Sequence, residues 1–248
     1  MFLKSNLESI LYIAILFIPV LLAGITVFFI KLTEGHLKLL LAFSAAYLLA
    51  LSFLHLLPEI FSLLPSPKAG LWVLAGFFIQ VLLEFFSSGI EHGHAHIHAE
   101  KNKVPVVLLF GLYLHSFIEG LPLAGTFNPS QSNGLMSFLM GITLHNIPIS
   151  IAFAGLLIHQ HIAKSKIVMY LSLLAVMAPA GALIGHLLQN TLGNVAHLST
   201  IFTAIVVGIF LHIATTIIFE SSEKNHRYHI TKLLSILLGV ALGYWLST

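Results

Sequence analysis

Eight long apolar stretches dominate this sequence and restrict the folds that it can adopt. They cover residues 8–30, 37–62, 70–90, 104–127, 134–159, 164–189, 196–220 and 231–247. About 20 apolar residues let a helix cross the roughly 30 Å hydrocarbon core of a bilayer. Only 8% of the residues are charged, whereas soluble domains average about 25%. The sequence therefore predicts an all-α polytopic membrane protein, with one transmembrane domain of eight helices over residues 1–248.

Charged residues and cysteine exclude several classes of function. The 11 Lys and Arg and the 9 acidic residues, all of them Glu, give a net charge of +2, which offers no basic surface to nucleic acid. The absence of Cys excludes disulfides, thiolate metal sites and cysteine nucleophiles. His-Glu-x-x-His, Gly-x-Ser-x-Gly and Walker A patterns are also absent, so we expect no enzyme. The expected partners are small ions and the lipid bilayer.

The positive residues between the stretches predict the orientation of the chain, because they collect on the cytoplasmic side of a membrane. With the N-terminus outside, nine of the 11 Lys and Arg fall on the inner side. An even number of helices then places the C-terminus outside as well. In a bacterium, the membrane would be the cytoplasmic (inner) one.

A His-rich segment over residues 91–103 would lie in the cytosol, between the third and fourth helices. Alternating imidazoles in a loop suit weak capture of metal ions. A solvated spacer without a metal role is the alternative. The four histidines concerned are His92, His94, His96 and His98.

Ionisable residues also occur inside the apolar stretches. Such a residue costs about 2.5–3.5 kcal/mol near the middle of a membrane helix, so it usually faces a partner or a cavity. His115 and Glu119 are four residues apart, which places them on one helix face. In the next stretch, His145 and Asn146 precede Pro148. Weaker candidates for a transport pathway are His55 and Glu59 in the second stretch and His212 and Glu220 in the seventh.

Prolines within the stretches indicate which helices lie inside the bundle. Each proline frees a backbone carbonyl, which membrane proteins tolerate where protein or a water-filled cavity satisfies it. This favours the second, fourth, fifth and sixth helices as interior ones, although proline is common in membrane helices in general. The prolines are Pro58, Pro122, Pro148 and Pro179.

The donor types predict the ligand chemistry. Imidazole with carboxylate and no thiolate suits divalent zinc, iron, manganese, cobalt or cadmium. Transport requires release as well as capture, so moderate affinity is appropriate. We therefore expect a metal ion as substrate and no cofactor, although a single His-x-x-x-Glu pair could also be only a structural hydrogen bond.

In their order and spacing, these motifs resemble the ZIP (Zrt/Irt-like) family of divalent-metal transporters over essentially the whole chain. The resemblance implies a metal path between the second, fourth, fifth and seventh helices, movement toward the cytosol and homodimers. It also implies metal-binding positions at His115, Glu119 and His145. The matching features are the His-rich loop, His55-Leu-Leu-Pro-Glu59, His115-x-x-x-Glu119-Gly120, His145-x-x-Pro148 and Ala178-Pro-Ala-Gly-Ala-Leu-Ile-Gly185.

Two departures from the family pattern affect the expected metal number. Ser116 stands where the family often has Asn or Asp, and Ile149 and Ser150 follow Pro148 where a carboxylate is usual. We keep Ser116 and Asn146 among the candidate ligands. With one carboxylate in the two central motifs, the sequence suits a single ion.

Other functions remain open from the sequence. Paired intramembrane histidines can ligate haem iron, although a haem protein would leave Glu119 unexplained. A transporter of protons or of another cation could use Glu119 as its carrier group. An intramembrane metal hydrolase is disfavoured because no activated water or nucleophile is evident.

Overall fold

The structure is a computed structural model that describes residues 2–30, 32–87, 104, 106–123, 134–192, 197–219 and 226–247. The His-rich segment of residues 91–103 and Glu220 lie outside the described residues. In the described part, every regular element is a helix. The elements are α1 (Phe2–Thr26), α2 (Glu34–Leu51), the π-helix η1 (Ser52–Leu56), α3 (Leu57–Leu63), α4 (Ser66–Ser87), α5 (Val106–Gly120), α6 (Leu135–His159), α7 (Lys164–Thr191), α8 (Leu198–Phe219) and α9 (His226–Ser247).

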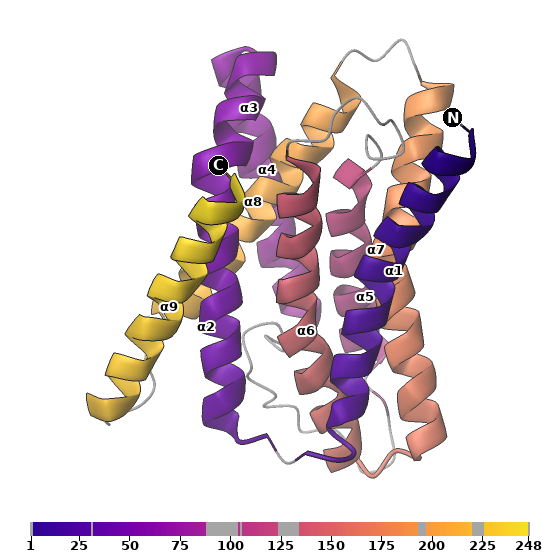
Figure 1. Ribbon diagram of the computed structural model, residues 1–248, viewed down its shortest axis with the longest axis vertical. Helices are drawn as coiled ribbons and strands as arrows, with labels where there is room; N and C mark the ends of the chain where they lie inside the picture. Colours follow the sequence, from indigo (N-terminus) through magenta and orange to yellow (C-terminus); the bar gives the residue numbers. More distant parts are fainter. Residues whose placement is uncertain are drawn as a thin grey trace.

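These elements form eight membrane spans, which confirms the predicted fold class. The described residues contain eight helices that are long and apolar enough to cross a bilayer. The second span consists of α2, η1 and α3 in continuous succession, so helix labels from α4 onward run one ahead of the span number. The spans alternate in direction along the bundle, and the two chain ends lie at the same end of it (Figure 1).

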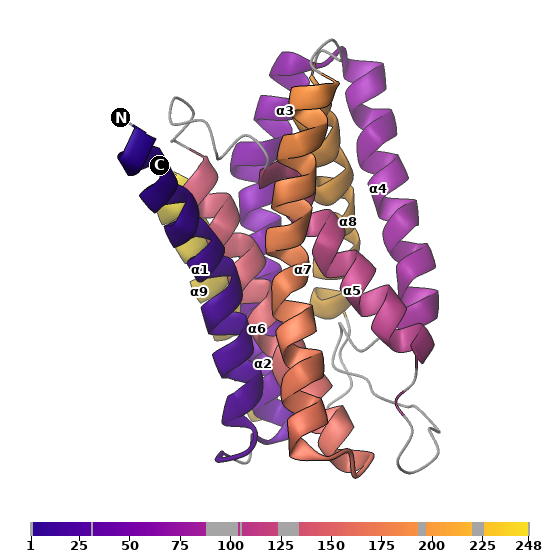
Figure 2. The ribbon, with the colours of Figure 1, turned by 90° about the vertical axis from the view of Figure 1, so that its right-hand side faces the viewer.

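The helices pack as two groups. In one group α1 packs on α6 and on α7, and α5 packs on α7; in the other α2 packs on α9 and α4 on α8. Figure 2 shows α7 between α1 and α5 in this view, with α4 at the right-hand edge of the bundle and α8 behind α7 and α5. Leu112 of α5, Phe153 of α6 and Leu171 of α7 are buried in one apolar cluster, which belongs to the first group. The two groups meet chiefly where α2 contacts α6 and α4 contacts α5.

Burial ranks the spans differently from the prolines. In the most apolar 18 residues of each span, the share of buried residues is 72% in α6, 61% in the second span and 50% in both α5 and α8, but only 39% in α7. The proline-based prediction of interior helices was therefore right for three spans and wrong in preferring α7 to α8. The four most buried spans are the second, fourth, fifth and seventh, the same four between which the family resemblance implies a metal path.

Local breaks mark two of the central spans. The second span passes through the π-helix η1, which ends two residues before Pro58. This proline has no N–H for an intrahelical hydrogen bond. The α-helix of the fourth span ends at Gly120 and continues as a 3₁₀ turn over residues 121–123, whereas the sequence predicted a helix to residue 127. Pro122 explains the earlier end, because it has no N–H for the carbonyl of Ile118.

Glycines let two helix pairs approach backbone to backbone. On α4 and α8, a Cβ at Gly76 would overlap the backbone oxygen of Ile205, and one at Gly208 would overlap that of Val73. Small residues allow such close contact between membrane helices. On α5 and α7, a Cβ at Gly120 would overlap the backbone oxygen of Ala178, and one at Gly181 would overlap that of Phe117. The second contact fixes α5 directly beside Glu119.

We predict that Gly76→Ala destabilises the protein, although alanine is the better helix former by about 0.8–1.0 kcal/mol. The new methyl group would force α4 and α8 apart, and overpacking of this kind costs about 1–3 kcal/mol. The matched control is Gly70→Ala on the same helix, where a Cβ meets nothing within 4 Å. Thermal unfolding in detergent checks the prediction: the midpoint should fall for Gly76→Ala and stay level or rise for Gly70→Ala.

Candidate metal site

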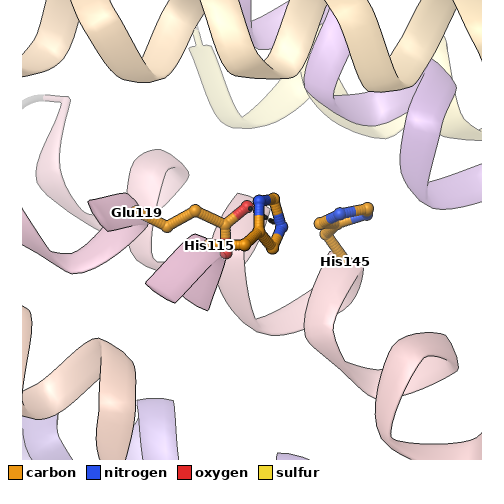
Figure 3. A group of neighbouring side chains, drawn as sticks. All are labelled: His115, Glu119 and His145. Atoms are coloured by element: carbon orange, nitrogen blue, oxygen red, sulfur yellow. Dashed lines mark ion pairs between the residues drawn. The ribbon is translucent and has the colours of Figure 1, made fainter. Parts of the chain in front are cut away.

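Three side chains from two helices converge in the interior of the bundle. His115 and Glu119 come from α5 and His145 comes from α6, and all three are 0% exposed. One ligand atom from each lies within 4.8 Å of the others. Figure 3 shows the His115 ring between the Glu119 carboxylate and the His145 ring. We call these three residues the central trio.

The central trio lies near the middle of the membrane span. His115 follows the start of α5 by nine residues, and His145 follows the start of α6 by ten. At 1.5 Å per residue these intervals are about 14 Å and 15 Å, roughly half of the 30 Å core. Both histidines therefore reach a similar depth although they come from opposite ends of the bundle.

The helical spacing of His115 and Glu119 brings their polar atoms together. Nε2 of His115 lies 3.2 Å from Oε1 of Glu119. The rings of His115 and His145 are 5.9 Å apart between centroids and nearly perpendicular. Two ligands bound at about 2.0–2.1 Å with tetrahedral geometry are about 3.3 Å apart, so the His115 and Glu119 atoms already have the separation that one ion requires.

Closure around an ion would need only small side-chain movements. Two ligand atoms at 2.0–2.1 Å from one ion are at most about 4.2 Å apart, and the central trio lies within 4.8 Å. Two imidazoles and one carboxylate match the preferences of zinc and similar divalent ions. The arrangement can therefore hold a single dication.

Asn146 orients Glu119 from the neighbouring helix. Its Nδ2 donates to Oε2 of Glu119 at 2.8 Å and to the backbone oxygen of Ile142 at 3.0 Å. Its Oδ1 accepts a hydrogen bond from Ser116 Oγ at 3.2 Å. These contacts hold one carboxylate oxygen toward Asn146 and leave the other facing His115. The ligand role predicted for Ser116 and Asn146 stays a prediction; in the structure they bond to each other, and Asn146 bonds to Glu119.

Pro148 modifies the backbone of α6 next to His145. It lies inside the helix and has no N–H to give to the carbonyl of Leu144. In a membrane helix, such a carbonyl is tolerated where protein or a water-filled cavity satisfies it. The carbonyl oxygen of Leu144, next to His145, therefore lacks the hydrogen bond that an N–H at residue 148 would donate.

The other intramembrane candidates lie apart from the central trio. His55 belongs to the π-helix η1 and is half-buried, and Glu59 of α3 is exposed. A Cβ on Gly134 would overlap Nε2 of His55, so this imidazole lies directly against the start of α6. Neither residue joins the three-residue group that could hold a metal among the described residues.

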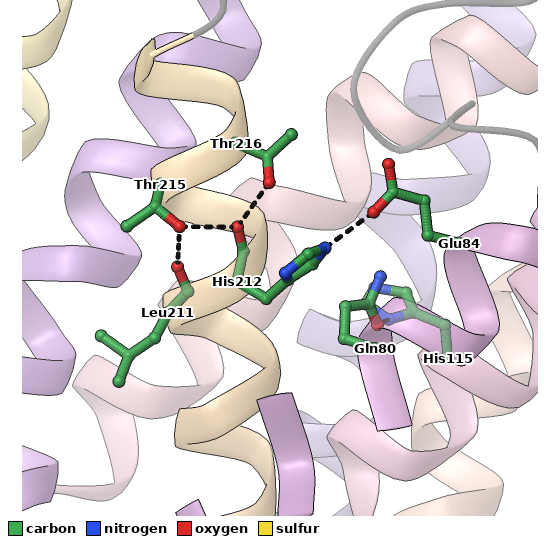
Figure 4. A network of polar contacts seen from close by, with 7 residues as sticks. All are labelled: Gln80, Glu84, His115, Leu211, His212, Thr215 and Thr216. Carbon is green, nitrogen blue, oxygen red and sulfur yellow. Dashed lines mark hydrogen bonds and ion pairs between the residues drawn. The ribbon is translucent and has the colours of Figure 1, made fainter. Parts of the chain in front are cut away.

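His212 pairs with a carboxylate that the sequence analysis had not selected. Its Nε2 lies 2.7 Å from Oε2 of Glu84 on α4, as Figure 4 shows. The predicted companion Glu220 lies outside the described residues, as do His92, His94, His96 and His98. The pathway and metal-capture roles of these residues therefore stay predictions.

The sequence analysis missed Gln80 of α4, which contacts the central trio. It is 0% exposed, and its Oε1 lies 3.0 Å from Nδ1 of His115. Figure 4 shows the two side chains next to each other. Gln80 lies one helical turn before Glu84 on α4. The available signal was an uncharged amide in the middle of the apolar stretch of residues 70–90.

Comparison with known proteins agrees with this architecture. A family model described as ZIP zinc transporter matches residues 94–247, which include the central trio and more than half of the chain. The chain belongs to the ZIP family. The predicted family is therefore confirmed, and because it is a family of transporters, the chain is not assigned to an enzyme class.

Individual ZIP relatives match different portions of the chain. Zinc transporter ZIP13 of Pongo abelii is 35% identical over 127 residues, which cover 46% of this chain and 37% of that protein. Zinc transporter zipt-7.1 of Caenorhabditis briggsae is 22% identical over 281 residues, covering 85% of this chain and 71% of the relative. Probable zinc transporter 12 of Arabidopsis thaliana is 24% identical, with 68% and 64% covered. The chain thus spans little more than a third of the ZIP13 relative.

We predict that Asn146→Ala lowers the free energy of unfolding by about 1–3 kcal/mol, because buried polar groups of Glu119 and Ser116 would lose their partner. The matched control is Asn190→Ala, which removes an exposed amide 3.1 Å from His186 and should change stability by at most about 0.5 kcal/mol. Unfolding in detergent without added metal checks both variants. Equal effects of the two substitutions would contradict the bridging role.

Proposed function

We propose that this ZIP protein transports divalent metal ions, with zinc as the first candidate, through a mid-membrane site formed by the central trio. The observation that carries the proposal is the convergence of His115, Glu119 and His145, all fully buried, within 4.8 Å. Family membership supports the metal as cargo, and the relatives are named zinc transporters. Iron, manganese, cobalt and cadmium have compatible ligand preferences.

Charge explains why these donors suit a passing dication. A buried carboxylate is costly unless it is paired, and the hydrogen bond from Asn146 offsets the charge of Glu119 only in part. A dication would be attracted by that charge and ligated by two imidazoles that add no further charge. Since only one carboxylate is present in the central trio, binding is moderate and release remains feasible.

The direction of transport belongs to this proposal. Both termini would face outside, and the ion would move toward the cytosol, where His92, His94, His96 and His98 could capture it weakly. The route would also pass the weaker candidates for a transport pathway, which are His55, Glu59, His212 and Glu220. The nine-to-two distribution of positive residues supports this orientation, and we expect the protein to work as a homodimer.

Alternating access would open the central trio to one side of the membrane at a time. The two helix groups provide units that can move against each other, with α5 and α6 carrying the ligands in one group. Rocking of one group of helices against another is a common solution in secondary transporters. An ion gradient would supply the driving force, because the sequence contains no Walker A pattern.

We expect Glu119→Gln to reduce zinc uptake at least tenfold, because the amide keeps the shape of the side chain but removes the only negative charge of the central trio. Uptake of radiolabelled zinc into proteoliposomes measures the effect. The matched control is Glu34→Gln, which alters an exposed carboxylate 3.1 Å from Lys38 and should retain the wild-type rate.

The same vesicles test the alternative function, in which the protein transports protons or another cation. A pH-sensitive dye inside them reports proton flux in the absence of zinc. Wild-type vesicles that carry protons without metal, with Glu119→Gln abolishing the flux, would favour the proton transporter. Zinc uptake that persists in Glu119→Gln at the wild-type rate would contradict the proposed site.

The orientation can be tested with single cysteines, because the native chain contains none. Ser66 and Ser165 are exposed serines at opposite ends of the bundle, at the starts of α4 and α7. We expect Ser66→Cys to react with a membrane-impermeant maleimide on intact cells. Ser165→Cys should react only after permeabilisation. The reverse pattern would overturn the predicted topology, and the cysteine-free parent serves as the blank.

A further inference from the structure

Gln80 makes a polar contact with the central trio from the opposite helix group. It lies on α4, which packs chiefly on α8, whereas His115 lies on α5, which packs chiefly on α7. Oε1 of Gln80 and Nδ1 of His115 are 3.0 Å apart, and both side chains are 0% exposed. In Figure 4, the amide lies alongside the imidazole.

The placement of the amide oxygen of Gln80 against Nδ1 favours one tautomer of the neutral His115 ring. An amide oxygen only accepts hydrogen bonds, so a bond at 3.0 Å requires that Nδ1 of His115 donate. A neutral imidazole has one N–H, and Nε2 then presents its lone pair. That nitrogen is the one that lies 3.2 Å from Oε1 of Glu119.

In the neutral ring, the lone pair of Nε2 faces Oε1 of Glu119 across 3.2 Å, and the two atoms repel unless a cation, either a proton or a metal ion, binds between them. The Gln80 contact therefore prepares His115 and Glu119 to receive a positive ion. Histidines that bind metals usually donate the other ring N–H to a fixed acceptor, and loss of that acceptor typically weakens metal affinity about 10- to 100-fold.

We propose that Gln80 is a positioning residue, which holds His115 in the tautomer and orientation that present Nε2 to the transported metal ion. This inference rests on the proposed function of the central trio. Gln80 itself does not touch the ion; it acts through the imidazole, from a helix of the opposite group.

A simple packing role would have different consequences. If Gln80 only filled space between α4 and α5, then Gln80→Met, which keeps the length and volume of the side chain, would preserve metal binding. Gln80→Glu would be the damaging change, because it introduces a buried charge. A positioning role reverses this order, since Glu retains an acceptor oxygen at the same reach and Met has none.

The experiment compares these two variants in the full-length protein reconstituted in nanodiscs. Binding of Co²⁺ is followed by calorimetry and by the intensity of its visible absorption bands. We expect Gln80→Met to weaken Co²⁺ binding about 10- to 100-fold and to alter the bands, and Gln80→Glu to bind at least as tightly as the wild type. Tyr113→Phe is the matched control, because it removes a part-buried interhelical hydrogen bond of α5, 3.0 Å to the Tyr170 oxygen, without touching the central trio.

Nitrogen NMR of ¹⁵N-histidine protein without metal tests the tautomer directly, with the His115 signal assigned from its loss in His115→Ala. We expect protonated Nδ1 in the wild type and in Gln80→Glu, and a shift toward protonated Nε2 in Gln80→Met. Wild-type Co²⁺ affinity in Gln80→Met, or an unchanged tautomer, would overturn the inference. If the wild type binds no Co²⁺, the proposed function fails, and the tautomer measurement still decides whether Gln80 fixes the ring.

Discussion

The buried carboxylate of Glu119 is the constraint around which this part of the bundle is organised. A charge in the middle of a membrane is tolerated only where it faces partners or a cavity. Oε2 of Glu119 accepts a hydrogen bond from Asn146, and Oε1 faces Nε2 of His115 where a cation would bind. Both neighbours are themselves fully or almost fully buried. The requirement to accommodate one charge therefore explains why α5 and α6 bring polar side chains together.

Backbone contacts make this accommodation possible. The close approach of Gly120 and Gly181 sets α5 against α7 one residue beyond Glu119. Gly76 and Gly208 set α4 against α8 one turn before Gln80. Positions that lack side chains thus fix the helices, and the polar side chains project from a defined scaffold into the space between the two groups.

The sequence predicted the fold and the pairing of His115 with Glu119 because the signals for both are local. Apolar length defines a span, and a separation of four residues places His115 and Glu119 on one face whatever surrounds the helix. The contacts of Gln80 and of Glu84 were missed, because spacing along one helix does not reveal which other helix it faces. The prediction from proline that α7 is an interior helix was wrong for a related reason. Protein can satisfy the carbonyl that a proline frees at any depth of burial.

Charge also bears on how many ions the site can hold. Asn146 uses both of its amide hydrogens on acceptors, and its oxygen accepts from Ser116. One turn along α6, Ile149 is 0% exposed and belongs to the apolar cluster of the first helix group. The α6 side of the site therefore supplies an imidazole and an amide but no second anion. One dication beside Glu119 leaves an excess charge of one, whereas two would leave three in a medium of low dielectric constant, where the repulsion between them is strong. Under the proposed function, ions would therefore pass one at a time, because the next dication gains a neutralising carboxylate only after the first has left.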